Sequence, residues 1–237
     1  MIKKQMTKDV FKNETVEQKQ KRAKKILGVL KRAYPRARMA LRYSNKWELL
    51  VAVILSAQCT DKKVNEVTAK LFKKYHTLKD YLRVDFREFE KDIYQTGFFH
   101  SKTKNILGAA RMIRRKFGGK IPKTMKEILE IPGVARKTAN IVLGNAYGII
   151  EGIAVDTHVH RISKRFYLTH EDSPEKIEQD LMGLFPKKEW FKLTYRIIEH
   201  GRAVCRARDP RCDLCPLKRL CPSAFQFPRF LSLNGKI

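Results

Sequence analysis

Apolar side chains recur at helical spacing along most of this chain, and that period constrains its fold more than any other feature. Between residues 16 and 34 they fall three or four positions apart, at Ala23, Ile26, Leu27, Leu30 and Tyr34, and a proline follows. Such spacing places apolar groups on one face of a helix. Only GIIEGIAV, residues 148–155, resembles a strand. The sequence therefore predicts an all-α protein.

Residues that favour helix ends mark further helices. Asn45, with Glu48 three positions later, resembles a capping box before the apolar segment WELLVAVILSA. Asp61 is expected to open DKKVNEVTAKLFKKY, and Ser101 to open SKTKNILGAARMIRRKFGG, which closes at a glycine pair. Two more helices are predicted, one beginning at Ser173–Pro174 and one over EWFKLTYRIIEHGR.

The charge of the chain indicates a polyanionic partner. It has 51 Lys and Arg against 24 Asp and Glu, a net charge of +27, with a sequence pI near 10.1. The positive charge clusters, because residues 1–38 hold thirteen Lys or Arg and three acids. A basic surface without a nucleic-acid role is the alternative, and binding to a membrane surface lacks an amphipathic aromatic anchor.

No segment has the pattern of a membrane span or a secretion signal. The longest apolar run, residues 49–55, is far too short to cross a bilayer, and MIKKQMTKDVFKNE has no apolar stretch of the signal-peptide type. The length of 237 residues and the 43% hydrophobic content suit a globular protein. We therefore expect a cytoplasmic location.

Four cysteines near the carboxyl terminus indicate a metal centre. Their spacing is C-x6-C-x2-C-x5-C, at Cys205, Cys212, Cys215 and Cys221. Disulfides are disfavoured in a cytosolic chain, and the spacing alone fits structural zinc and a 4Fe-4S cluster about equally. The remaining Cys59 lies in a predicted apolar helix and is expected in the core. The arginines and lysines between the ligands would form a basic patch suited to phosphates.

The stretch IPGVARKTANIVL, residues 131–143, breaks a local rule. Arg136 and Lys137 stand in the first turn of a predicted helix, where the helix dipole disfavours cations. Pro132 and Gly133 mark a tight turn just before it, so the backbone N–H groups there should point at an anion.

These motifs together resemble the endonuclease III family, the iron-sulfur DNA glycosylases and abasic-site lyases that carry a helix-hairpin-helix. IPGVARKTA, then AVDTH, then the cysteine spacing occur in order, and LLVAVILSAQCTD extends the match, which runs from about residue 45 to 221. The resemblance implies a 4Fe-4S cluster in the loop 205–221. It also implies two helical lobes with a DNA-binding groove between them: residues 39–149 with the hairpin, and residues 1–38 with 150–237.

The resemblance assigns the chemistry to two residues. Lys137 would be the nucleophile, since the positive end of the helix favours its neutral amine. The alternative is one more cation that binds phosphate. Asp156 would stabilise positive charge on the deoxyribose and take part in proton transfer, and it can also serve as an ordinary N-cap. His158 and His160 are expected to form hydrogen bonds or face DNA rather than bind metal.

The remaining site residues implied by the resemblance contact DNA. Gly133, Ala135 and Arg136 would bind a phosphate at the hairpin. Gln58 would fill the space that a flipped nucleotide vacates, and Phe98, in TGFFHSK, would be the apolar wedge. The family has a leucine at the wedge and a glycine where Ala135 stands. A positive φ at Ala135 would cost about 1–2 kcal/mol.

The function implied is base excision repair by a bifunctional glycosylase and lyase. It would remove oxidised pyrimidines from duplex DNA through a lysine Schiff base and β-elimination. We expect a monomer that works on damaged or abasic duplex DNA, without a membrane partner, on the nucleoid of a bacterium or archaeon. The alternatives are a sister glycosylase with another base as substrate and a non-enzymatic, zinc-stabilised DNA-binding protein. The adenine-removing mismatch branch is disfavoured because its enzymes lack a lysine at the position of Lys137.

Overall fold

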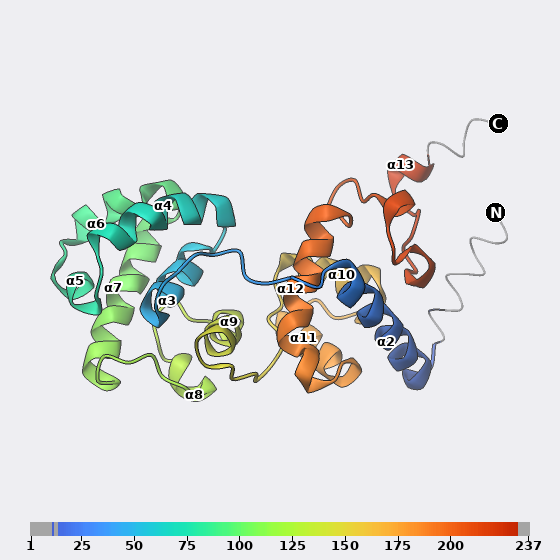
Figure 1. The fold of residues 1–237 in the computed structure, drawn as a ribbon, viewed down its shortest axis with the longest axis horizontal. Coiled ribbons are helices and arrows are strands. Elements are labelled where there is room, and N and C mark those ends of the chain that lie inside the picture. Colours follow the sequence, from blue (N-terminus) through green and yellow to red (C-terminus); the bar gives the residue numbers. More distant parts are fainter. Residues whose placement is uncertain (1–10, 12–13, 232–237) are drawn as a thin grey trace. The chain divides into compact units, whose positions relative to one another are not determined.

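The computed structural model describes residue 11 and residues 14–231, and its helices form two compact units (Figure 1). Residues Met39–Glu151 make up one unit, and residues from 1–38 and 152–237 make up the other. The described residues contain no β-strand, so the prediction of an all-α fold is confirmed. The strand predicted over residues 148–155 is wrong. Ile153 and Val155 are apolar because they pack into the core of their unit along an irregular connection.

The unit Met39–Glu151 is built around one helix that is buried almost all round. Its elements are α3 (Lys46–Leu55), α4 (Asp61–Lys74), α5 (Leu78–Arg83), α6 (Phe86–Ile93), the 3-10 turn η1 (Tyr94–Thr96), α7 (Phe99–Lys116), α8 (Met125–Ile128) and α9 (Arg136–Tyr147). Every residue of α3 from Trp47 to Leu55 is buried. A helix that is apolar on all faces must be covered on all faces. Helices α4, α7 and α9 pack against it (Figure 1).

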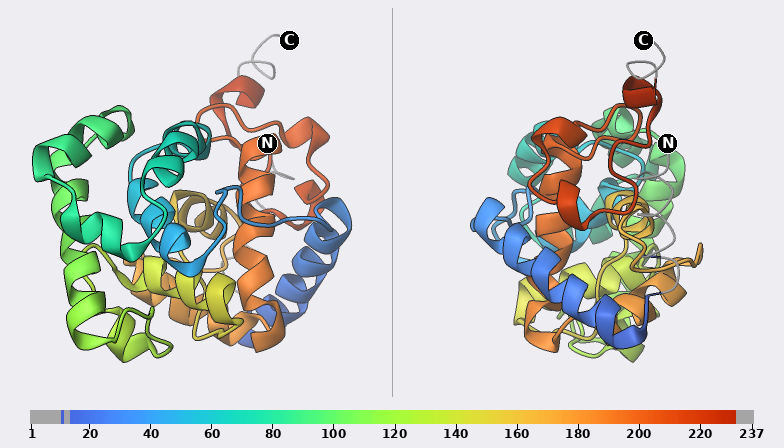
Figure 2. Two further views of the ribbon diagram at one scale, coloured as in Figure 1. Left: turned by 60° about the vertical axis from the view of Figure 1, so that its left-hand side comes forward. Right: turned by 90° about the vertical axis from the view of Figure 1, so that its right-hand side faces the viewer.

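The other unit joins the amino-terminal helix to the carboxyl-terminal part of the chain. Its elements are α2 (Val16–Ala33), α10 (Thr157–Arg165), α11 (Pro174–Leu184), α12 (Lys187–Ala203), the 3-10 turns η2 (Cys212–Leu214) and η3 (Lys218–Leu220), and α13 (Pro228–Leu231). Helix α2 packs against α11 and α12, and α10 packs against α12 (Figure 2). Two of the cysteines, Cys205 and Cys215, belong to the same apolar core.

Capping side chains explain where most helices begin. Asn45 accepts a hydrogen bond from the Glu48 N–H at 2.9 Å, and the Glu48 carboxylate accepts from the Ser44 N–H at 2.6 Å, one position earlier than a capping box requires. Thr, Ser or Asp residues stand at the N-cap positions of α2, α4, α5, α6, α8, α10 and α11. The predicted helices over residues 16–34 and from Ser173–Pro174 are confirmed.

Helix α7 begins differently from the prediction. It starts at Phe99, two residues before the expected Ser101, and its N-cap residue is Phe98. No polar side chain caps this end; instead Gly97 and Phe98 turn the chain with φ angles of 67° and 48°. Helix α9 also has no side-chain cap, since Ala135 holds its N-cap position. In α7 and α9, the N-cap residue is one that the resemblance implies in DNA contact.

Candidate functional site

The hairpin between α8 and α9 is a tight turn that only glycine fits. Gly133 has a φ of +80°, and a Cβ atom there would lie 2.8 Å from the Cβ of Asn105. Both the left-handed backbone and the close approach of Asn105 exclude a side chain. The Val134 N–H donates to the Ile131 carbonyl at 3.0 Å and closes the turn.

The alanine that follows the turn is not strained. Ala135 has a φ of −89° and a ψ of 172°, an ordinary extended conformation. The backbone strain that a positive φ would cause at this alanine is therefore absent. Ala135 has no polar side chain, so the N-cap residue of α9 makes no side-chain capping hydrogen bond to the start of the helix. Such a helix end is suited to an anion.

Lys137 is the second residue of α9 and its side chain is exposed. Arg136 precedes it, half-buried, at the start of the same helix. The local geometry therefore presents an amine beside a helix end that favours anions. Lys137 belongs to the unit Met39–Glu151.

Asp156 is the N-cap of α10 in the other unit. Its Oδ1 accepts from the Val159 N–H at 2.7 Å, so the capping role that the sequence suggested is present. The carboxylate is half-buried and held in one orientation by this bond. Two residues later, His158 lies 3.2 Å from the Arg161 guanidinium, measured from Nδ1 to Nη2, and serves in hydrogen bonding.

Gln58 and Phe98 both project from turns with left-handed backbones. Their φ angles are 52° and 48°, values that residues other than glycine seldom adopt. Gln58 is exposed, and Phe98 is 63% exposed rather than part of the core. Exposure of a large apolar side chain on a strained turn is a feature that functional sites share.

The four cysteines line one cavity. Arg165, His200, Lys218 and Phe227 contribute to its wall. All five cysteines of the chain are free thiols. In the described part of the chain, no three or more His, Cys, Asp or Glu side chains are arranged so that they could hold a metal ion.

The cavity shields these thiols from water. Burial raises the pKa of Cys215 to about 11 and raises the pKa values of Cys212 and Cys221 as well, with the neighbouring thiols adding to each effect. Buried thiols with raised pKa values stay protonated at neutral pH unless a metal displaces the proton. Since the cavity is lined by four thiols and no carboxylate, the donor set fits an iron-sulfur cluster.

Two arginines of α10, the helix that Asp156 caps, bind the cysteine segment, residues 205–221. Arg165 donates to the Cys205 sulfur at 3.2 Å and to the carbonyls of Arg206 and Ala207 at 2.7 Å each. Arg161 donates to the Cys205 carbonyl at 3.0 Å. An ordered cysteine segment therefore supports α10. Sequence reasoning missed both arginines, although their spacing of four places them on one face of the helix.

The residues after the last cysteine cover the cavity. The Arg165 guanidinium lies 4.5 Å from the centroid of the Phe227 ring, and Ala224 also lines the cavity. The Phe225 N–H bonds to the Cys212 sulfur, and Phe225 reaches it with a φ of 61°. The sequence alone assigned no role to this tail. Residues 232–237, its last part, lie outside the described residues.

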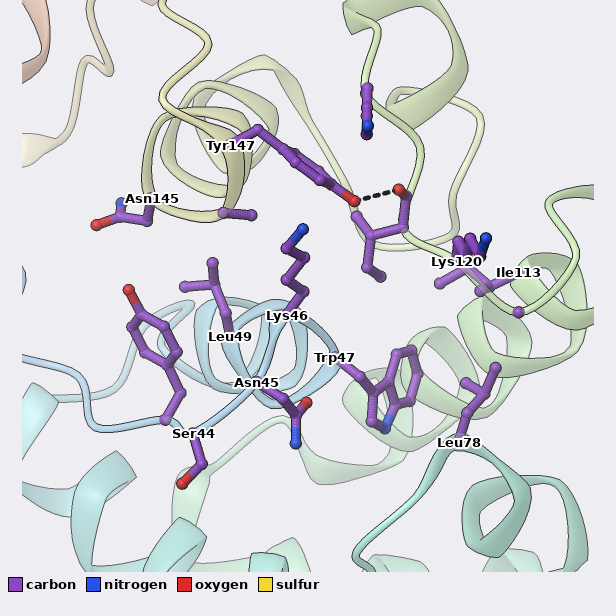
Figure 3. Close-up of a pocket in the computed structure, with 15 residues that line it drawn as sticks. Ser44, Asn45, Lys46, Trp47, Leu49, Leu78, Ile113, Lys120, Asn145 and Tyr147 are labelled. Carbon is purple, nitrogen blue, oxygen red and sulfur yellow. Dashed lines mark hydrogen bonds between the residues drawn. The ribbon is translucent and has the colours of Figure 1, made fainter.

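A larger cavity of about 760 Å³ lies at the other end of α9 from Lys137. Asn145 and Tyr147 line it from the end of α9, and Lys46 points at the Tyr147 ring, 3.9 Å from its centroid (Figure 3). The eight residues from Lys137 to Asn145 span about 12 Å along a helix. This cavity is therefore not the place where Lys137 acts.

The sequence comparisons assign the fold to a class of proteins. Residues 51–187 match the family described as HhH-GPD superfamily base excision DNA repair protein. That match covers more than half of the chain and includes the turn at Gly133, Lys137 and Asp156. The chain belongs to this superfamily. Among the described residues, no helix is long and apolar enough to span a membrane.

Individual relatives narrow the class to endonuclease III. The chain is 52% identical over 206 residues to endonuclease III of Synechocystis sp., across 87% of this chain and 94% of that protein. It is 46% identical over 189 residues to endonuclease III of Bacillus subtilis, across 79% and 86% of the two chains. A solved structure of a trapped endonuclease III–DNA covalent intermediate matches with a TM-score of 0.84 and 41% identity, across 87% and 97%. The resemblance stated from the motifs is confirmed.

Proposed function

We propose that this protein is a base excision DNA glycosylase and abasic-site lyase that removes oxidised pyrimidines from duplex DNA. The single observation that carries the proposal is the exposed Lys137 at the uncapped start of α9, directly after the Gly133 turn. Backbone N–H groups at such a turn hold a phosphate without reading sequence, which places the amine beside the sugar. The likeness to endonuclease III supports the same activity.

Lys137 supplies the nucleophile in the reaction. Its neutral Nζ forms a bond to the sugar C1′ while the bond from C1′ to the base breaks, and the base leaves with that electron pair and gains a proton. The new C1′ amine then loses a proton and the sugar ring opens, which gives a Schiff base. Loss of a C2′ proton expels the 3′ phosphate by β-elimination and cuts the strand.

Asp156 supplies charge stabilisation. We propose that its carboxylate stabilises the positive charge that develops on the sugar when the base leaves, and accepts the proton of the attacking amine. The hydrogen bond from the Val159 N–H holds the carboxylate in position before substrate binds.

Gln58, Phe98 and the cysteines take no part in breaking the bond to the base. Gln58 would fill the gap left by the flipped nucleotide and Phe98 would wedge the neighbouring bases apart. Gly133, Ala135 and Arg136 would hold the phosphate. The four cysteines would hold a 4Fe-4S cluster, which when bound supplies structural order to residues 205–221. We infer that the protein acts as a monomer on the cytoplasmic nucleoid, which its charge of +27 favours.

Borohydride trapping tests this proposal. Borohydride should reduce the Schiff base with an abasic duplex and leave protein and DNA covalently joined, and Lys137→Gln should abolish that product while it still binds DNA. Asp156→Asn should slow base removal but retain the adduct on preformed abasic sites. Lys79→Gln, which removes a charge from an exposed position of α5, is the matched control and should trap normally. Absence of an adduct in the wild type would refute the lyase mechanism.

A further inference from the structure

Lys102 stands where a lysine is expected least. It lies in the first turn of α7, near the positive end of the helix dipole, and only 4% of it is exposed. Its position shares a face with Ile106, Ala109 and Ile113, which are core residues. Burial lowers the pKa of its ammonium group, which reflects the cost of removing a cation from water. Such a cost requires compensation.

The compensation comes from carbonyl oxygens of two separate segments. The Lys102 Nζ donates to the Leu55 carbonyl at 2.8 Å and to the Thr96 carbonyl at 2.8 Å. Leu55 ends α3, where the last carbonyls have no partner within the helix and the dipole favours a cation. Thr96 ends η1. The Lys102 N–H also donates to the Phe98 carbonyl at 3.0 Å.

Each of these segments leads directly to a residue that the proposed function places in the DNA. Gln58 is three positions after Leu55 in the Gln58 loop, residues 56–60. Phe98 is two positions after Thr96 in the Phe98 loop, residues 96–98. Both residues have left-handed backbones, which persist only where the surrounding structure holds them. Lys102 binds the base of both loops.

We propose that Lys102 is a positioning residue that holds the Gln58 and Phe98 loops at a fixed separation, so that both side chains enter the DNA stack together. The inference rests on the proposed roles of Gln58 and Phe98 in nucleotide flipping. The ammonium group is suited to this task because it has three donors and can bind two carbonyls from different segments at once. A hydrocarbon side chain would leave both carbonyls without this donor and both loops without a common anchor.

The test compares base flipping with chemistry. Lys102→Met keeps a long unbranched side chain and removes the ammonium group. At saturating enzyme, single-turnover excision of thymine glycol from duplex DNA should slow roughly 10- to 100-fold, the effect of a misplacement of about 1 Å. The fluorescence rise of 2-aminopurine beside the lesion, which reports unstacking, should slow by the same factor. Borohydride trapping on single-stranded abasic DNA should change by less than about twofold, because Lys137 is intact and there is no duplex to enter.

Three variants separate positioning from general damage to the fold. Lys104→Met, at an exposed position of the same helix, removes the same charge and should excise normally. Lys102→Arg keeps a cation with several donors and should restore most of the rate. In a Gln58→Ala, Phe98→Ala background, Lys102→Met should slow excision by less than about a further twofold. If Lys102→Met does not fold, Lys102→Gln, which keeps donor atoms, replaces it in every arm.

Each outcome decides the matter. Normal duplex excision by Lys102→Met would overturn the inference, and so would an equal loss of duplex excision and single-strand trapping, or a further large loss in the loop-variant background. A wild type that neither excises nor traps would instead refute the proposed function. The two failures therefore have different signatures.

Discussion

Gly133 carries a strict steric requirement at the hairpin. Its φ of +80° lies in the left-handed region, and the Asn105 side chain occupies the space where a Cβ would go. Ala135, which stands where the family has a glycine, needs no such freedom because its φ is −89°. At the scale of single residues, the backbone angle and the neighbouring atoms determine which substitution the hairpin tolerates.

We predict that Gly133→Ala destabilises the unit Met39–Glu151 and weakens DNA binding. The left-handed backbone costs about 1–2 kcal/mol with an alanine, and the contact with Asn105 adds about 1–3 kcal/mol of overpacking. Movement of the turn would also misdirect the N–H groups that hold phosphate. Denaturant unfolding and a duplex-binding assay measure the two effects.

Gly183→Ala is the matched control for this substitution. Gly183 lies within α11, and no atom lies within 4 Å of where its Cβ would be. An alanine there should leave stability unchanged or raise it by about 0.5–1 kcal/mol. If Gly133→Ala proved as benign as Gly183→Ala, the steric account of the turn would be wrong.

The cysteine segment shows how one element supports another. Residues 205–221 contain only two 3-10 turns, η2 and η3, yet the carbonyls of Cys205, Arg206 and Ala207 receive the arginines of α10. A segment with so little secondary structure needs another source of order. A bound metal cluster would provide it, and through Arg161 and Arg165 it would support the helix that Asp156 caps.

We predict that Cys212→Ser loses the metal and the order of residues 205–221 together. Structural metal binding is part of the folding free energy, and a hydroxyl is a poor ligand for iron. Iron and sulfide analysis, absorbance and limited proteolysis of the purified protein measure the change. Cys59→Ser is the control, because Cys59 packs against the core of the other unit and should leave the metal content unchanged. Full metal content and unchanged proteolysis in Cys212→Ser would contradict the assignment, and a colourless zinc protein would replace the cluster with zinc.

At the scale of the whole molecule, charge dominates the interaction with DNA. The chain has a net charge of +27. Its exposed cations include Arg206 and Arg208 in the cysteine segment, and Lys137 at the hairpin. Phosphate contacts release counterions from the duplex, so their number sets the dependence of affinity on salt.

We predict that affinity for undamaged duplex falls steeply as salt rises. The slope of log K against log salt should be about −0.9 for each phosphate contacted. The double variant Arg206→Gln, Arg208→Gln should make the slope shallower, whereas Lys79→Gln on α5 should not. Fluorescence anisotropy titrations at several salt concentrations measure the slopes. An affinity that did not change with salt would argue against phosphate binding by both the hairpin and the cysteine segment.

The sequence by itself determined the features that depend on neighbours along the chain. The helix start at Asn45 follows from a capping side chain, and the start at Ser173 from a proline in the first turn. The turn at Gly133 follows from a local backbone requirement, and the four-cysteine spacing from positions within 17 residues. Helical periodicity was enough to predict an all-α fold. The apolar run at residues 148–155 was misread as a strand because burial without a pairing partner gives the same pattern.

Only the tertiary structure decided the features that join distant segments. Lys102 reaches the Leu55 carbonyl across 47 positions, and Arg165 reaches the carbonyls of Arg206 and Ala207 across 41 and 42. Nothing in the local sequence specifies such partners, because the carbonyls that accept are common to every residue. The left-handed turn that starts α7 at Phe99 has the same origin: the hydrogen bond from the Lys102 ammonium group to the Thr96 carbonyl, rather than a capping side chain, holds it. Local propensity therefore determines which residues form helices, and long-range hydrogen bonds determine where the loops between them lie.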